Sequence, residues 1–187
     1  WIGLGVGIAG TAVVGVALET SLLRYFYRRD HLSQVLGTFA LLLMANEAVR
    51  MIWGSQPLSL NPPQALAGPV ELLPDFHYSA YRLFIIGVGL LVALGLYLLV
   101  TRTRLGMQVR AGASNRDMAL AMGVPVGRLF TGVFALGAAL CALAGGLLGP
   151  LLAVQVGMGE HILILAFVAI VIGGIGSMRG AFFGALL

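Results

Sequence analysis

Polar and ionisable side chains inside apolar segments are the residues of this chain that could do chemistry. Asn46, Glu47 and Arg50 lie in the apolar run 32–53. Ionisable groups at membrane depth are energetically expensive and by default point to function. Glu47 and Arg50 are three apart and can pair along one helical face, so a structural pair or an interhelical hydrogen bond is favoured there over a substrate contact. Asn46 is the better candidate for a polar lining of a pathway, with Gln155 as a second candidate.

No pattern of catalytic or metal-binding residues accompanies these side chains. The sequence contains no zinc motif, no nucleophile elbow and no serine, histidine and acid set within the apolar runs. His77 has no partner ligands near it, and Cys141 is the single cysteine. The arginine ladder of a voltage sensor and the filter sequence of a channel are also absent. Neither catalysis nor a metal or cofactor is therefore expected.

Composition places the chain in a membrane. Hydrophobic residues make up 59% and charged residues 10%, against roughly 25% charged in soluble domains, and the mean hydropathy is +1.00. The net charge of +4 does not indicate nucleic-acid binding, which requires a basic face on a water-soluble fold. Here most of the arginines lie in loops, so membrane topology accounts for them and no nucleic acid is expected as a partner.

The apolar runs predict an all-α polytopic transmembrane helix bundle, with about five spans and the start of a sixth. Four runs have spanning length, and the fifth has only 11 residues before a group of glycines. The chain opens directly into an apolar run and stops as another begins, so we expect a single transmembrane domain over residues 1–187 that lacks both termini of a longer protein. The five predicted spans are residues 1–18, 32–53, 83–100, 129–152 and 162–172.

Charge distribution predicts the sidedness of the loops. Residues 19–31 and 102–128 are basic and are expected in the cytoplasm, because arginine and lysine concentrate in cytoplasmic loops. The connection 54–82 is rich in proline and has no basic residue before Arg82, so it is expected outside as an extended loop.

Small residues predict where helices meet. A stripe at intervals of four in the fourth span should pack closely on another helix; its members are Gly137, Cys141, Gly145 and Gly149.

The glycines Gly173, Gly174 and Gly176 leave two alternatives open for the fifth run. The helix either continues through them to a cytoplasmic Arg179 or breaks at membrane depth. Discontinuous helices beside glycine are one way to build a transport pathway, and close helix packing at the glycines is an equally favoured account.

A short helix is predicted inside the cytoplasmic segment 102–128. Ser114 and Asp117 have the spacing of a capping box, so the helix should begin at Ser114. Gly123 can take the left-handed cap conformation and Pro125 cannot easily continue the helix, which gives about eight residues, or about 12 Å. A short rod anchored in two spans is suited to receive force from a soluble partner.

The same segment carries a family resemblance. Residues 117–123 resemble the Glu-Ala-Ala-x-x-x-Gly loop of ABC importer permeases, with Asp117 at the acid, Met118 at the first alanine, and Ala119 and Gly123 matching directly. The flanking text RTRLGMQVRA and MGVPVGRLFTGVFALGAALCALAGGLLGP, with RRDHLSQVLGTF, MIWGSQPLS and VIGGIGS elsewhere, closely resembles LivH-type permeases of branched-chain amino acid ABC importers. The similarity covers nearly all of the 187 residues.

This resemblance implies a multi-pass permease of the bacterial inner membrane. Its partners would be two cytoplasmic ABC ATPases that hydrolyse ATP, a second homologous or identical permease, an external solute-binding protein and membrane lipid. Asp117, Met118, Ala119 and Gly123 would lie on the coupling helix that docks into an ATPase. The substrates would be leucine, isoleucine and valine, although permeases for urea and short-chain amides are very similar.

Other classes remain open on the sequence alone. Residues 115–122 could form an interfacial helix lying on lipid, and the chain could be a passive channel, an ATP-independent carrier or a membrane scaffold.

Overall fold

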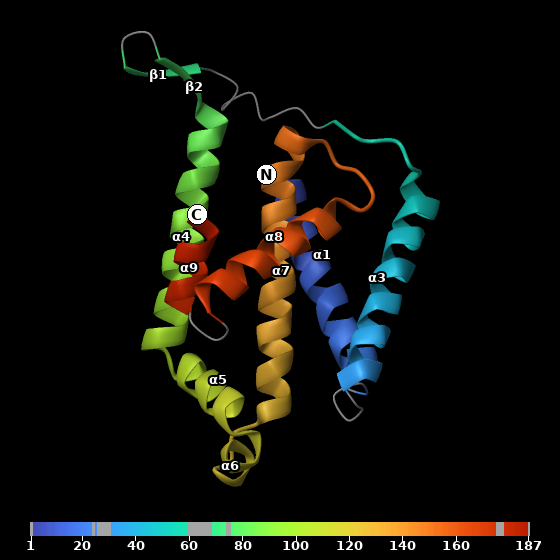
Figure 1. The fold of residues 1–187 in the computed structure, drawn as a ribbon, viewed down its shortest axis with the longest axis vertical. Helices are drawn as coiled ribbons and strands as arrows, with labels where there is room; N and C mark the ends of the chain where they lie inside the picture. Colours follow the sequence, from blue (N-terminus) through green and yellow to red (C-terminus); the bar gives the residue numbers. More distant parts are fainter. Residues whose placement is uncertain are drawn as a thin grey trace.

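The computed structural model describes residues 2–23, 25, 31–59, 69–73, 76–174 and 178–186. Helices dominate, and a small hairpin joins two of them (Figure 1). In chain order the elements are α1 (Ile2–Leu18), the π-helix η1 (Glu19–Leu23), α3 (His31–Trp53), β1 (Pro69–Leu73), β2 (Phe76–Ser79), α4 (Ala80–Arg102), α5 (Arg104–Ser114), α6 (Arg116–Ala121), α7 (Val126–Leu152), α8 (Met158–Gly173) and α9 (Met178–Leu186).

The predicted helical membrane bundle is confirmed. Among the described residues, four helices are long and apolar enough to cross a membrane: Gly3–Leu22, Val35–Trp53, Ala80–Arg102 and Val126–Leu152. Most of their apolar side chains face outward, as expected where lipid replaces a protein core as the apolar surroundings. The fifth predicted span, residues 162–172, lies within α8, which has 16 residues against the roughly 20 that a crossing needs.

The two ends of the bundle differ in structure. Figure 1 shows α5, α6 and the start of α3 at the lower end, and the β1–β2 hairpin and the end of α7 at the upper end. Within the connection 54–82, Pro69–Leu73 and Phe76–Ser79 form strands where an extended loop was predicted. In the hairpin Pro69 pairs with Ser79 and Val70 with Tyr78, and proline at the first strand position removes no hydrogen bond that the ladder requires.

Helices α1 and α7 pack closely through small residues. A Cβ atom placed on Gly15 would lie 2.7 Å from the Cβ of Ala138, and one on Gly146 would lie 3.2 Å from Leu4 Cδ1. The α7 residues in contact are thus offset by one position from the predicted stripe, a rotation of about 100° around the helix. Within the described residues the stripe as a whole does not meet a helix. Gly137 and Gly145 have nothing within 4 Å of such an atom and Cys141 is exposed, whereas Gly149 is buried.

Helix α1 does not end where the first cytoplasmic loop was predicted to begin. It continues as a π-helical turn through Leu23, and the first residue of that turn, Glu19, is only 2% exposed. The Thr131 hydroxyl on α7 donates to Glu19 Oε2 at 2.6 Å. A partner on α7 thus allows this acid to lie inside the bundle, and the loop boundary predicted at residue 19 is displaced.

The glycines after α8 break the helix. Gly174 has a φ of +87°, and α9 folds back against α8. No Cβ could fit at Gly173, which lies against the backbone of Gly180 and Ala181, and one on Gly184 would be 2.5 Å from the Ala169 carbonyl oxygen. Of the two alternatives left open by the sequence, the helix breaks and does not continue through the glycines, and these glycines also pack closely. Gly176 lies outside the described residues.

Helix α8 runs obliquely across the view of α7 in Figure 1, from the side of α3 toward α4 and α9. Between α4 and α9 is an apolar cavity of about 560 Å³, lined by Leu94, Tyr97 and Phe182 among others. The last two helices therefore extend the bundle sideways and do not add a complete crossing.

Candidate coupling helix and translocation path

The short helix α6 begins one residue later than predicted. Asn115 is its N-cap, and the Asn115 side chain accepts a hydrogen bond from the Met118 backbone amide at 3.0 Å. The predicted capping box at Ser114 is wrong because Ser114 is the last residue of α5. A residue with helical backbone angles cannot serve as an N-cap, whose backbone is extended as that of Asn115 is.

The end of α6 is fixed by the glycine that the sequence indicated. Gly123 has a φ of +79°, its amide donates to the Leu120 carbonyl at 3.0 Å, and the Val124 amide donates to the Ala119 carbonyl at 3.0 Å. These two bonds are those of a Schellman motif. The six-residue helix is therefore capped at both ends, which makes it a defined rod in spite of its length.

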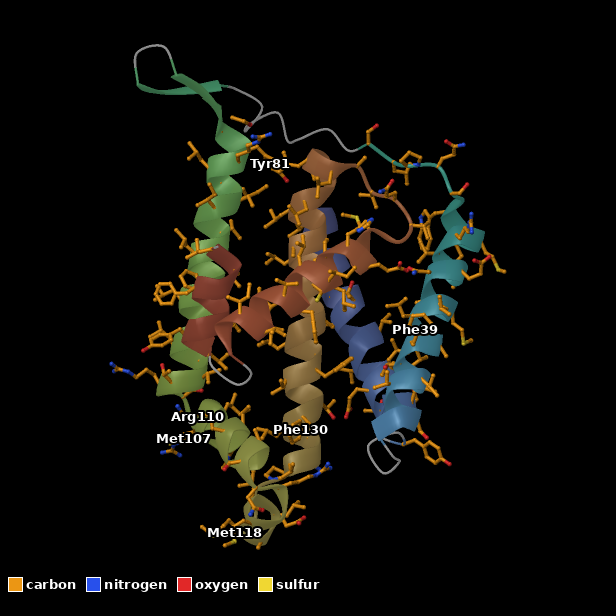
Figure 2. All side chains as sticks on the ribbon, viewed as in Figure 1. Phe39, Tyr81, Met107, Arg110, Met118 and Phe130 are labelled. Atoms are coloured by element: carbon orange, nitrogen blue, oxygen red, sulfur yellow. The ribbon has the colours of Figure 1, made fainter. Side chains whose placement is uncertain are left out.

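One side of α6 is buried and the other is open. Ala119 is 5% exposed, whereas Met118 is 65% and Met122 is 81% exposed. The Arg116 guanidinium lies 5.9 Å from the centre of the Phe130 ring on α7, a cation–π distance that ties the helix to the bundle. In Figure 2 Met118 lies at the far lower tip of the molecule, where a partner could reach it.

Helix α5 was not predicted, and it completes the support of α6. Thr103 caps its start by accepting from the Gly106 amide at 3.2 Å. A Cβ on Gly112 would lie 3.8 Å from Leu129 and Phe130 of α7, so the two helices are in close contact. The Thr103 cap was a signal for α5 that could have been recognised in the sequence. Figure 2 shows Met107 and Arg110 of α5 at the edge of the molecule.

The four residues predicted on the coupling helix therefore lie together at one end of the bundle. Asp117 is in the first turn of α6 and is exposed, Met118 is exposed beside it, Ala119 faces the interior, and Gly123 ends the motif. The exposed methionines offer an adaptable apolar contact surface, and the capped backbone holds that surface in place.

The polar residues predicted along the pathway are only partly brought together. Asn46 Nδ2 on α3 donates to Glu160 Oε1 on α8 at 2.8 Å. An interhelical hydrogen bond was one of the roles expected for Glu47 and Arg50. Such a bond is present, but Asn46 makes it. Glu47 and Arg50 are both exposed, and no ion pair joins them within the described ranges, so the predicted pair is not formed.

Glu160 was missed by the sequence reasoning. The sequence does hold a signal for Glu160, because this acid lies in a short segment between two apolar runs. Gln155 is exposed in the connection between α7 and α8. Gly173 and Gly174 lie at the other end of α8, about 20 Å along the helix from Glu160. The predicted pathway residues therefore do not form one site, and Asn46 with Glu160 is its structurally defined part.

Comparison with known proteins identifies the family of this chain. The family described as branched-chain amino acid transport system / permease component matches residues 1–187. The chain is a member of that permease family. It is accordingly a multi-pass protein of the bacterial inner membrane, in agreement with the four spanning helices among the residues described.

Named relatives of the permease come from several organisms. It is 41% identical over 110 residues to the high-affinity branched-chain amino acid transport system permease protein BraD of Pseudomonas aeruginosa, covering 58% of this chain and 36% of the relative. It is 29% identical over 202 residues to the protein LivH of the same description from Escherichia coli, covering 100% of this chain and 63% of the relative. The fructose import permease protein FrcC of Rhizobium meliloti is 30% identical over 194 residues, covering 99% of this chain and 51% of the relative.

The permease spans between about a third and two thirds of the length of these relatives. No solved structure matches it.

Proposed function

We propose that this permease forms the translocation pathway of an ABC importer for leucine, isoleucine and valine. The observation that carries the proposal is α6, a six-residue helix capped at both ends that presents exposed methionines while Ala119 anchors it. Such a helix can transmit a displacement without bending. The names of the BraD and LivH relatives support the branched-chain amino acid substrates.

The proposed assembly contains two cytoplasmic ABC ATPases, a second permease that is homologous or identical, and an external solute-binding protein. ATP hydrolysis takes place in the ATPases and not in this chain. An ATPase would contact α6 at Asp117 and Met118, with Ala119 and Gly123 holding the shape of the contact. Membrane lipid would surround the spans.

The mechanism is alternating access driven through α6. Displacement of α6 passes to α7 through Pro125 and Val126, and Val126 is only 1% exposed, so it cannot slip against its neighbours. Helix α7 in turn displaces η1, and with it α1, through the hydrogen bond from Thr131 to Glu19. The spans then tilt, and a route past Asn46 opens alternately to the outside and to the cytoplasm.

Replacing Gly123 tests the class of transporter. In Gly123→Val the β-branched side chain cannot adopt the φ of +79° without strain, which amounts to about 1–2 kcal/mol. The α6 cap should therefore deform and ATP-driven uptake should be lost. Gly95→Val is the matched control, because Gly95 has open space around it and an ordinary backbone angle.

Uptake is measured in proteoliposomes that contain the full assembly. An ABC importer loses ATP-driven leucine uptake in Gly123→Val and retains it in Gly95→Val. A passive channel or an ATP-independent carrier keeps its flux in both variants, and that result would overturn the proposal. A helix that only lies on lipid would give a permease that does not bind the ATPases at all.

Substrate identity is tested on the external binding protein. Calorimetric titration with leucine, valine, urea and fructose should give binding to the two amino acids. Fructose is included because the relative FrcC is named a fructose permease, and urea because urea permeases resemble this sequence. Binding of only urea or fructose would exclude the branched-chain assignment while leaving the ABC importer class intact.

A further inference from the structure

The contact between Asn46 and Glu160 joins α3 to α8, and the segments beyond the adjoining ends of these helices are also paired, Leu58 with Val154. Asn46 is seven residues before Trp53, the last residue of α3, which places it about 10 Å inside that span. No described side chain of α3 is buried, so this helix packs loosely on the rest of the chain. The first turn of α8 reaches it through the 2.8 Å hydrogen bond to Glu160.

The contact between Asn46 and Glu160 offers hydrogen-bond acceptors and a negative charge but no positively charged partner. Asn46 uses its amide N–H group on Glu160, which leaves the Asn46 carbonyl oxygen as an acceptor, and a carboxylate has two acceptor oxygens. Within the described ranges, Glu160 has no arginine or histidine at ion-pair distance. A carboxylate at membrane depth without a cation is expensive and normally pairs with one.

A metal ion does not suit this site. The described residues contain no group of three or more histidine, cysteine, aspartate or glutamate side chains that could hold one. An ammonium group suits it better, because it carries one positive charge and three N–H donors for the two or three oxygens available.

We propose that Asn46 and Glu160 bind the ammonium group of the amino acid as it crosses the outer half of the membrane. This inference rests on the proposed function, since it assumes that the substrate is an amino acid. Glu160 supplies the charge and Asn46 supplies a second oxygen. The apolar side chain of the substrate needs no polar partner and can lie against the neighbouring apolar surface of α3.

The test separates the charge of Glu160 from its hydrogen bond. Glu160→Gln keeps an oxygen that can accept from Asn46 but removes the negative charge. A purely structural contact would leave leucine uptake unchanged in this variant. Ammonium binding predicts that uptake by the reconstituted assembly falls about tenfold, equivalent to about 1.4 kcal/mol. Stimulation of the ATPases by the loaded binding protein should be retained, because the change lies far from α6.

Two further variants complete the experiment. Glu160→Asp keeps the charge and should recover at least about a third of wild-type uptake. Glu71→Gln is the charge-matched control, since it removes one acid from strand β1 of the 54–82 connection, and its uptake should equal that of the wild type.

Asn46→Ala decides the matter if the Glu160→Gln protein fails to assemble. It removes one of the two proposed ligands and leaves the carboxylate, so ammonium binding predicts that uptake per assembled complex falls several-fold while the amount of assembled complex stays the same. A structural tie predicts that the amount of assembled complex falls while uptake per complex is unchanged. Wild-type uptake of leucine in Glu160→Gln, or unchanged uptake per assembled complex in Asn46→Ala, overturns the inference. Absence of leucine uptake in the wild-type assembly refutes the proposed function itself.

Discussion

Removing the Thr131 hydroxyl is expected to weaken the bundle at Glu19, the buried acid among the residues that the structure describes. Glu19 is 2% exposed, and its Oε2 atom lies 2.6 Å from Thr131 Oγ1, a length typical of a charge-assisted hydrogen bond. Thr131→Val keeps a side chain of similar shape but leaves the carboxylate without its donor. The hydroxyl is also 3.0 Å from the Gly127 carbonyl oxygen, and that local contact is lost as well.

The expected loss in the free energy of unfolding of Thr131→Val follows from two ranges of hydrogen-bond energies. Interhelical hydrogen bonds in membranes average about 0.6 kcal/mol and reach about 1.7, whereas hydrogen bonds to charged groups in proteins contribute about 1.5–3 kcal/mol. Because Glu19 is almost fully buried, water cannot replace the lost donor, so the upper part of the membrane range applies. We expect the free energy of unfolding to fall by about 1.5–2 kcal/mol.

The assay is equilibrium unfolding of the purified permease in detergent, with Thr20→Val as the matched control. Thr20 adjoins Glu19, is exposed, and donates its hydroxyl to the Val16 carbonyl of its own helix at 2.8 Å. A double-mutant cycle of Thr131→Val with Glu19→Gln should return a coupling energy of at least about 1 kcal/mol. Equal stabilities of Thr131→Val and Thr20→Val, or a coupling energy near zero, would refute the reasoning.

Two further predictions concern packing and capping. Gly15→Val should separate α1 from α7 by several tenths of an ångström or more, because even a Cβ at this position would clash, and overpacking of this kind lowers the free energy of unfolding by about 1–3 kcal/mol. Gly3→Val, at a position with nothing within 4 Å, should match the wild type in the same unfolding measurement. Asn115→Ala should remove the N-cap of α6, at about 1 kcal/mol, and weaken binding of the ATPases several-fold by titration. Ser114→Ala should have little effect on that affinity, and an equal loss in the two variants would mean that the cap does not shape the contact.

Much of the fold was predictable because it depends on local features of the chain. Apolar length alone located the four spanning helices, since an unbroken run of about 20 apolar residues has few alternatives to crossing a bilayer. Gly123 was correctly predicted to take a left-handed conformation, which depends on its own backbone and its immediate neighbours. Helix α5 was not predicted, although Thr103 at its start offers a capping signal comparable to that of Ser114, eleven residues later.

The candidate pathway was less predictable because its contacts join distant parts of the chain. Asn46 was selected for its depth in a span, but its partner Glu160 is 114 residues away. A local pair of Glu47 and Arg50 was the only partnership that spacing could offer, and it does not form. Glu19 begins the basic segment 19–31 that the sequence predicts as a loop, and only the position of Thr131 on α7 allows it to be buried.

The amino-acid sequence by itself determined the lengths of the spans and the left-handed end of α6. These features follow from backbone preferences and from the transfer of apolar side chains into lipid, which act over a few residues or a single helix. The tertiary structure alone decided which face of α7 meets α1, that α8 breaks and α9 folds back, and that Asn46 reaches Glu160. Those outcomes depend on how each helix is rotated about its own axis, and that rotation is set by the neighbours against which the helix packs.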